Sequence, residues 1–182
     1  RALDSLPEDA TLALKWATLM HDIGKYDTFG VDDERIRYDH HASVGAQIAK
    51  QILTRLKFPR KIIERVYWLI EHHMMVIPLL EMSDGRRRHW FLQPSFPEML
   101  ELYRADSMGI EPLDLSLYEK LKRLYNHEIA KLKLMPKNLL SGNEIMKLLQ
   151  LKPGEKIGTI LADLREKQLN EDLKTKKQAK EY

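Results

Sequence analysis

Apolar residues recur along almost the whole chain at the three- and four-residue spacing of amphipathic helices. Pro7 and the two acids after it are typical of a first helical turn, so a first helix is predicted to start there. Its apolar stripe runs from Leu12 to Ile23. Residues 26–39 lose the pattern and contain an acidic run, which predicts a solvated loop.

Two further helices follow this predicted loop. The second is expected to open at His40-His41 and to stop at Phe58-Pro59. The third is expected to start near Arg60 and to end at Pro78. His73 falls on the apolar face of the third helix, seven positions after Val66 of the same face. Its neighbour His72 falls on another face.

The middle of the chain is predicted to hold a connection and then two helices. Residues 83–97 indicate a connection, because Asp84-Gly85 is a turn signal. The next helix carries Asp106 on its apolar stripe. A buried carboxylate needs an ion pair or a bound cation, so a salt bridge and a metal ligand both remain open for it. A long amphipathic helix is expected from Leu113 to Leu134, closed by Met135-Pro136.

The tail restarts with a helix-capping pattern. Ser141 and Glu144 have the spacing of a capping box, and two short amphipathic helices follow, the second ending near Asn170. Thr175 is expected to cap a last helix. No strand is predicted anywhere. The sequence therefore predicts an all-α fold, with one helical domain over residues 1–136 and a small helical segment over residues 137–182.

Composition narrows the possible protein classes. The 182 residues are 43% apolar and 31% charged, which is typical of a folded globular protein. Cysteine is absent, which excludes disulfides and thiolate metal sites and fits a cytoplasmic protein. No apolar run approaches the ~20 residues of a membrane span. The net charge of +3 permits a polyanionic partner without requiring one. Because the chain begins with Arg1, we expect a fragment of a longer protein.

The strongest chemical signal is His21-Asp22, where the first helix is predicted to end. An imidazole and a carboxylate form the mixed ligand set that suits Mn, Fe, Ni, Zn or, less well, Mg. Lys25 places a cation where a phosphate could bind. Taken alone, His21-Asp22 is more simply explained as a capping or salt-bridge pair. However, His41, His73 and Asp106 are predicted on other helices, and separate helices of a bundle can project such side chains into one pocket.

A second chemical signal is basic. Arg86, Arg87 and Arg88 stand directly before a histidine, a tryptophan and a phenylalanine. A solvated charge run is the simplest interpretation. Contact with phosphate or RNA is the alternative, because guanidinium groups suit phosphates and aromatic faces suit bases.

The order His21-Asp22-x-Gly-Lys25, then His41, His73 and Ala105-Asp106, resembles the HD superfamily of metal-dependent phosphohydrolases. The resemblance can be narrowed to the HD region of the tRNA nucleotidyltransferase / poly(A) polymerase family. It rests on four blocks, which are His41–Ala46, His73-Met74, Tyr103–Ser107 and the tail segment from Leu140 to Gly158. The similarity spans nearly the whole chain.

The resemblance implies a role for each matching residue. His21, Asp22 and Asp106 would hold a divalent ion, which could be Mn, Ni, Fe or Mg. His41 and His73 would serve as further ligands or as acid/base groups, and Lys25 would contact a phosphate. Arg104, in the Tyr103–Ser107 block, and Arg86 to Arg88 are assigned to phosphate or RNA contact. Such proteins hydrolyse phosphoesters of nucleotides or RNA ends.

Two departures from the family pattern are visible. HD enzymes carry another histidine one helix before the His-Asp pair, and residues 1–20 contain none, so it is expected upstream of Arg1. The strand-based nucleotidyltransferase head is also missing, and it is expected elsewhere in the parent chain. This chain is therefore not expected to add nucleotides alone. The alternative function is a non-catalytic helical body that holds tRNA for the missing head.

Overall fold

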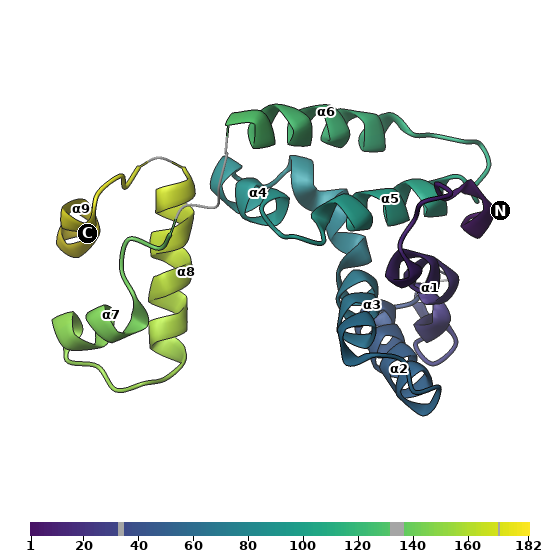
Figure 1. The fold of residues 1–182 in the computed structure, drawn as a ribbon, viewed down its shortest axis with the longest axis horizontal. Coiled ribbons are helices and arrows are strands. Elements are labelled where there is room, and N and C mark those ends of the chain that lie inside the picture. The colour runs from purple at the N-terminus through teal and green to yellow at the C-terminus, as the bar shows by residue number, and fades with distance from the viewer. Residues whose placement is uncertain (33–34, 132–136, 171) are drawn as a thin grey trace. The chain divides into compact units, whose positions relative to one another are not determined.

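The computed structural model describes residues 1–32, 35–131, 137–170 and 172–182 (Figure 1). The α-helices are α1 (Leu12–Met20), α2 (His41–Arg55), α3 (Arg60–His72), α4 (Asp84–Phe91), α5 (Phe96–Ser107), α6 (Ser116–Lys131), α7 (Gly142–Leu149), α8 (Glu155–Leu169) and α9 (Lys176–Glu181). The shorter elements are the 3-10 helices η1 (Leu3–Ser5), η2 (Ile23–Lys25) and η3 (His73–Leu80) and the strands β1 (Gly30–Asp32) and β2 (Arg35–Arg37). The predicted all-α fold is confirmed, with one small hairpin added.

The chain forms two compact units. Unit 1 consists of Arg1–Leu79 and Pro94–Arg123, and unit 2 consists of Leu80–Gln93 and Leu124–Tyr182. The boundary predicted after residue 136 stays a prediction, because residues 132–136, which include Met135-Pro136, lie outside the described part of the chain. No helix in the described ranges has the length and apolar character that crossing a membrane demands.

Unit 1 is a bundle in which α3 packs against α1, α2 and α5. Small residues on α1 and α2, such as Ala17, Ala46 and Ala49, are fully buried and allow the helices to approach closely. Larger side chains from α3 and α5 fill the remaining core, among them Leu69 and Met99. This packing brings the C-terminal ends of α1 and α3 and the N-terminal end of α2 toward one side of α5.

One close approach sets the position of α2 beside the end of α1. Gly24, in η2, lies directly against the first turns of α2. A Cβ atom on Gly24 would lie 2.2 Å from the carbonyl oxygen of His41 and 2.6 Å from the backbone nitrogen of Gly45. Only glycine fits between these backbone atoms, and this contact places His41 near His21 and Asp22.

The predicted start of the first helix was wrong. α1 begins at Leu12, because the side chain of Thr11 accepts a hydrogen bond from the backbone N–H of Leu14 and caps the helix there. The third helix also ends earlier than expected. α3 stops at His72, and the 3-10 helix η3, which contains Pro78, continues the chain. Pro78 has no N–H to donate, so an α-helix cannot continue through it.

Two segments expected to be irregular are ordered. Residues 26–39 contain the antiparallel hairpin β1–β2, with Val31 opposite Ile36. Residues 83–97 were predicted as a connection, which was wrong, because they contain α4. Gly85 belongs to the first turn of α4 and packs on α8, where an added Cβ would lie 2.5 Å from Asn170 Oδ1. This contact spans more than eighty residues, so the local sequence could not reveal it.

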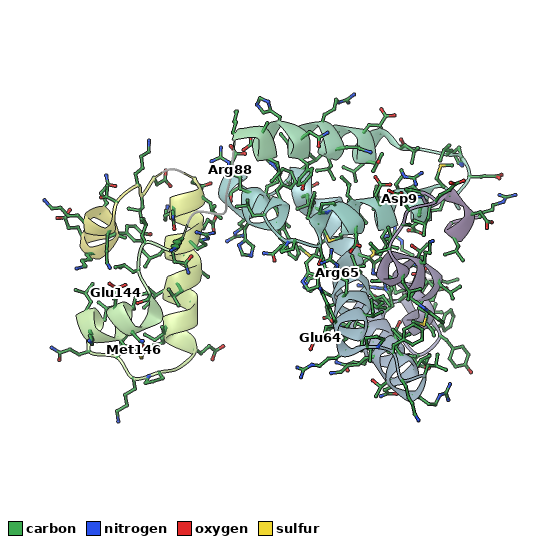
Figure 2. All side chains as sticks on the ribbon, viewed as in Figure 1. Asp9, Glu64, Arg65, Arg88, Glu144 and Met146 are labelled. Carbon is green, nitrogen blue, oxygen red and sulfur yellow. The ribbon has the colours of Figure 1, made fainter. Side chains whose placement is uncertain are left out.

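Unit 2 is built around the contact of α4 with α8 and a small apolar cluster of the tail helices. The cluster consists of Leu140, Ile145, Ile157, Leu164, Leu173 and Ala179. The predicted capping box is confirmed, since Ser141 and Glu144 bond each other's backbone groups at the start of α7. The predicted cap at Thr175 is confirmed as well. Figure 2 labels Glu144 at this helix start and Arg88 on α4.

Candidate metal centre

The first half of the site is a cluster of His21, Asp22 and Asp106. His21 directly follows α1 as its C-cap and is buried, and its Nδ1 donates a hydrogen bond to the carbonyl oxygen of Thr18 at 2.9 Å. Its Nε2 lies 3.1 Å from Asp106 Oδ1 and 3.4 Å from Asp22 Oδ2. One potential ligand atom of each residue lies within 4.8 Å of the others. The packing of the bundle thus brings Asp106 of α5 close to His21 and Asp22, which are neighbours in the sequence.

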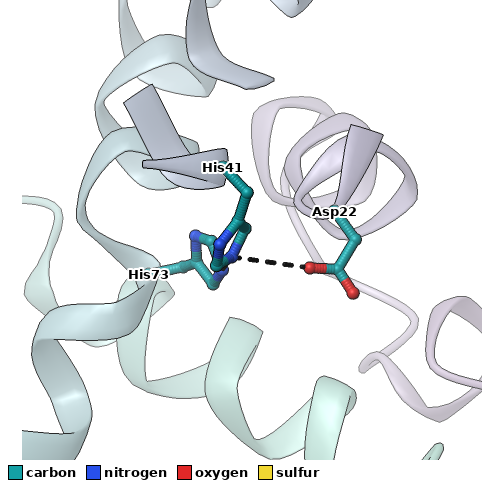
Figure 3. A group of neighbouring side chains, drawn as sticks. All are labelled: Asp22, His41 and His73. Atoms are coloured by element: carbon teal, nitrogen blue, oxygen red, sulfur yellow. Dashed lines mark hydrogen bonds and ion pairs between the residues drawn. The ribbon is translucent and has the colours of Figure 1, made fainter. Parts of the chain in front are cut away.

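The second half of the site contains His41 and His73. His41 is the first residue of α2, and its Nδ1 donates to the Tyr38 carbonyl oxygen at 2.8 Å. His73 follows α3, and its Nδ1 donates to the Ile70 carbonyl oxygen at 2.7 Å. The two Nε2 atoms lie 3.2 Å apart. Asp22 joins them, with its Oδ1 3.7 Å from His41 Nε2 (Figure 3). Asp22 therefore belongs to both clusters.

The ring hydrogen bonds determine which nitrogens face the site. A backbone carbonyl can only accept, so Nδ1 of each of the three histidines carries a proton and each Nε2 points toward the other site groups. Two neutral rings in this arrangement would bring two lone pairs together at the 3.2 Å separation of His41 and His73. Such a contact is favourable only when a proton or a metal cation lies between the nitrogens. The donor set of imidazoles and carboxylates therefore fits a divalent transition-metal ion.

The pKa shifts of His21 and Asp22 also indicate that this position favours a cation. Burial lowers the pKa of His21, but hydrogen bonds to Asp106 and Asp22 outweigh it and raise that pKa to about 10. The metal-free imidazole therefore carries an Nε2 proton between two carboxylates at pH 7. Burial raises the pKa of Asp22, yet the bonds from His21 and Lys25 dominate and hold that pKa well below its usual value. Burial lowers the pKa of His73, which keeps that ring neutral.

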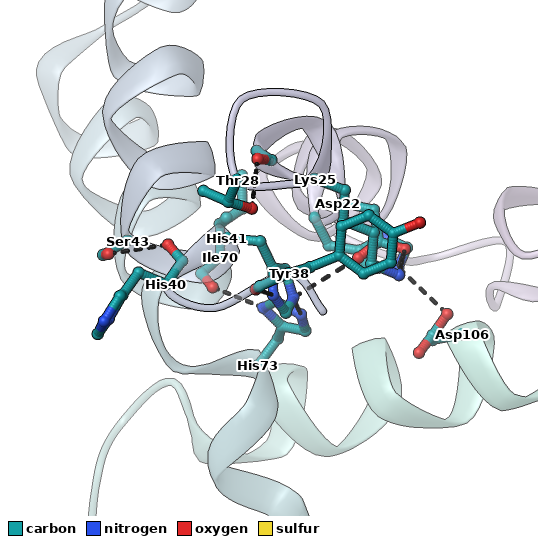
Figure 4. Close-up of polar contacts among 12 residues, drawn as sticks. Asp22, Lys25, Thr28, Tyr38, His40, His41, Ser43, Ile70, His73 and Asp106 are labelled. Carbon is teal, nitrogen blue, oxygen red and sulfur yellow. Dashed lines mark hydrogen bonds and ion pairs between the residues drawn. The ribbon is translucent and has the colours of Figure 1, made fainter. Parts of the chain in front are cut away.

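A cavity of about 650 Å³ opens over these groups, all within unit 1. Its wall consists of His21, Asp22, Lys25, Arg37, Tyr38, Asp39, His40, His41, His73, Met74, Ile77, Leu102, Tyr103, Asp106, Ser107 and Ile110. The ammonium of Lys25 lies 2.7 Å from Asp22 Oδ2 (Figure 4). The side chain of Asp106 is 40% exposed, so the expectation of a buried carboxylate was wrong, because this face of α5 borders the cavity.

The hairpin and the residue after it also contribute to this wall, which was not predicted from the sequence. Arg37 ends β2, and Tyr38 follows it. Tyr38 both accepts the hydrogen bond that fixes His41 and places its ring beside Lys25, whose ammonium lies 5.5 Å from the ring centroid (Figure 4). The alternating arginines before Tyr38 and the adjacent His40-His41 were the available signal for an ordered segment here.

The arginines assigned to phosphate contact are engaged by protein groups. Arg104 bonds Glu101 at 2.7 Å and the Ser5 carbonyl oxygen at 2.6 Å. In unit 2, Arg86 pairs with Glu166, Arg87 with Asp84, and Arg88 with Glu128. Among the described residues that line the cavity, these four arginines do not occur. Their contact with phosphate or RNA stays a prediction.

Comparison with known proteins agrees with this geometry. The family model described as HD domain matches residues 2–108. The CC-adding tRNA nucleotidyltransferase of Thermus thermophilus is 36% identical over 177 residues, which cover 96% of this chain and 40% of that protein. The A-adding tRNA nucleotidyltransferase of Deinococcus radiodurans is 34% identical over 186 residues, covering 96% of this chain and 42% of that protein.

A more distant relative is the Multifunctional CCA protein of Psychromonas ingrahamii, 28% identical over 112 residues, which cover 54% of this chain and 25% of that protein. The chain thus spans about two fifths of the length of the first two relatives. No solved structure matches it.

Proposed function

Because this chain belongs to the HD domain family, we propose that its unit 1 is a divalent-metal phosphohydrolase acting on phosphoesters of nucleotides or RNA ends. The parent protein would be related to the tRNA nucleotidyltransferases that the chain resembles. The observation that carries the proposal is the convergence of three imidazole Nε2 atoms and two carboxylates from four separate segments of unit 1. A structural salt bridge would need only one histidine and one carboxylate.

His21, Asp22 and Asp106 are the groups that would hold the ion, and His41 and His73 lie beside the shared Asp22 as acid/base groups. When bound, a divalent cation would offset negative charge on the phosphoryl oxygens and lower the pKa of a water molecule. The ammonium of Lys25 lines the same cavity and can approach a phosphate oxygen. The site thereby concentrates positive charge where the phosphoester would bind.

Hydrolysis also requires proton transfer, which the His41–His73 pair can perform. As water oxygen attacks phosphorus, a proton must leave that water, and when the ester P–O bond breaks, the leaving oxygen must gain one. Burial keeps His73 neutral, so its Nε2 can accept a proton. The 3.2 Å separation from His41 Nε2 lets the two rings share that proton before it passes to the leaving group.

The test is hydrolysis of a phosphomonoester and of a 2′,3′-cyclic nucleotide with added Mn²⁺ or Ni²⁺. Loss of a direct ligand should exceed the 10–100-fold effect typical of outer-shell partners, so Asp106→Asn is expected to lower turnover by about 100-fold or more. Asp27→Asn makes the same chemical change at an exposed position outside the cavity lining, and should leave turnover unchanged. Equal turnover in the two variants would refute the proposal.

A second candidate function is RNA binding by unit 2, favoured by the uneven charge of the chain. Unit 2 contains 15 Lys and Arg residues against 10 Asp and Glu, a net charge of +5. Unit 1 contains 15 against 17, a net charge of −2. Because Arg86, Arg87 and Arg88 are paired with carboxylates, exposed lysines such as Lys147 and Lys156 supply much of this excess. A basic unit of this kind suits a polyanion.

A further inference from the structure

Asp22 already has a cationic partner within the chain. Lys25 lies three residues later, at the end of η2, and its ammonium donates a hydrogen bond to Asp22 Oδ2 at 2.7 Å. Both side chains are about two-fifths exposed, so the pair borders the cavity. The two residues are only three positions apart, so the pair forms within one short stretch of chain.

The carboxylate oxygen that Lys25 occupies is the one nearest the first ligand cluster. Asp22 Oδ2 lies 3.4 Å from His21 Nε2, whereas Oδ1 lies toward His41 Nε2 at 3.7 Å. A metal ion held by His21, Asp22 and Asp106 would therefore approach the same oxygen that the ammonium bonds, and the two cations would repel each other there.

We infer that Lys25 is a resident counter-cation of Asp22, which a divalent ion must displace in order to bind. The inference rests on the metal site proposed above and does not depend on its turnover. A competing ammonium lowers the affinity for every cation. It discriminates against monovalent ions in particular, because an ion of single charge gains little by replacing another single charge, whereas a divalent ion gains a second unit of attraction.

Tyr38 offers the displaced ammonium a second position. The Lys25 ammonium already lies 5.5 Å from the centroid of the Tyr38 ring, within the range of a cation–π contact. Rotation of the lysine stem can therefore release Asp22 without moving the charge out of the cavity. From there the ammonium remains able to contact a phosphate on the substrate.

The test is the dissociation constant of Mn²⁺ for the 182-residue chain, measured by isothermal titration calorimetry without substrate. Lys25→Met keeps most of the stem length and removes the charge, so Mn²⁺ should bind about 3- to 10-fold more tightly, because a partly exposed ion pair no longer has to be broken and a nearby positive charge is gone. Lys25→Arg retains the competing charge and should bind within about twofold of the wild type.

Lys50→Met is the matched control, since Lys50 also lies over a tyrosine ring, at 5.7 Å from the Tyr67 centroid, but outside the cavity lining. It should leave Mn²⁺ binding unchanged. If Lys25→Met does not fold, Lys25→Gln takes its place. Mn²⁺ binding that is equal, weaker or absent in the neutral Lys25 variant overturns the inference. Tighter Mn²⁺ binding without any phosphoester turnover supports it and refutes only the proposed hydrolase.

Discussion

Replacing Gly24 by alanine should separate the two halves of the candidate site. The added Cβ would lie 2.2 Å from the His41 carbonyl oxygen, 2.6 Å from Gly45 N and 3.0 Å from Gly45 Cα. All three neighbours are backbone atoms of α2, so no side-chain rotation relieves the overlap, and the start of α2 must move by about 1 Å. Overpacking of this kind destabilises by about 1–3 kcal/mol, and three backbone clashes place Gly24→Ala at or above the upper end.

Urea unfolding measures this destabilisation. Trp90 is the tryptophan of unit 2, so in a Trp90→Phe background the signal from Trp16 and Trp68 follows unit 1 alone. Gly30→Ala is the control within unit 1, because nothing lies within 4 Å of its added Cβ in β1, and it should change the stability of unit 1 by no more than about 1 kcal/mol. A Gly24→Ala variant within about 1 kcal/mol of wild type, with unchanged Mn²⁺ binding, would show that this close contact does not hold the two halves of the site together.

Two further predictions concern protons and RNA. His21 has its pKa raised to about 10, so its ion pairs stabilise the metal-free protein fully below pH 6.5 and that stabilisation disappears as pH rises toward 10. A metal must displace that proton, so Ni²⁺ affinity measured by calorimetry should rise about tenfold per pH unit between pH 6.5 and 8, and a flat profile would contradict this. If unit 2 binds tRNA, charge reversal at Lys147 and Lys156 should reduce the salt-dependence slope by about one unit for each phosphate that the protein no longer neutralises, and an unchanged slope would exclude a role for these two lysines.

The sequence predicted most helices because their apolar spacing and caps are local. The capping box at Ser141 and the helix start at His41 after a segment without periodicity need only neighbouring residues to be recognised. Two errors arose where distant contacts or a change of helix type decide the structure. α4 forms across Asp84-Gly85 because Gly85 packs against α8, and Pro78 is accommodated by a 3-10 helix.

For the site, the sequence provided the residue types but not their contacts. His21, Asp22 and Asp106 carried a recognisable order along the chain, and the structure brings them together. The pairing of Lys25 with Asp22 and the position of Tyr38 depend on how η2 and the hairpin lie beside α2, and no periodicity contains that information. The metal and catalytic roles assigned to these residues stay predictions.

The three site histidines are held by the same kind of hydrogen bond. Each ring donates to the backbone carbonyl oxygen three residues before it, at Thr18, Tyr38 and Ile70. Every imidazole is thus oriented by its own stretch of backbone. The rotational entropy of these side chains is therefore lost when the protein folds and not when a ligand binds. Donors that are already rigid bind a ligand faster and more tightly. Natural or engineered changes in the helix core would then alter how far apart the rings stand while leaving the direction of each ring intact.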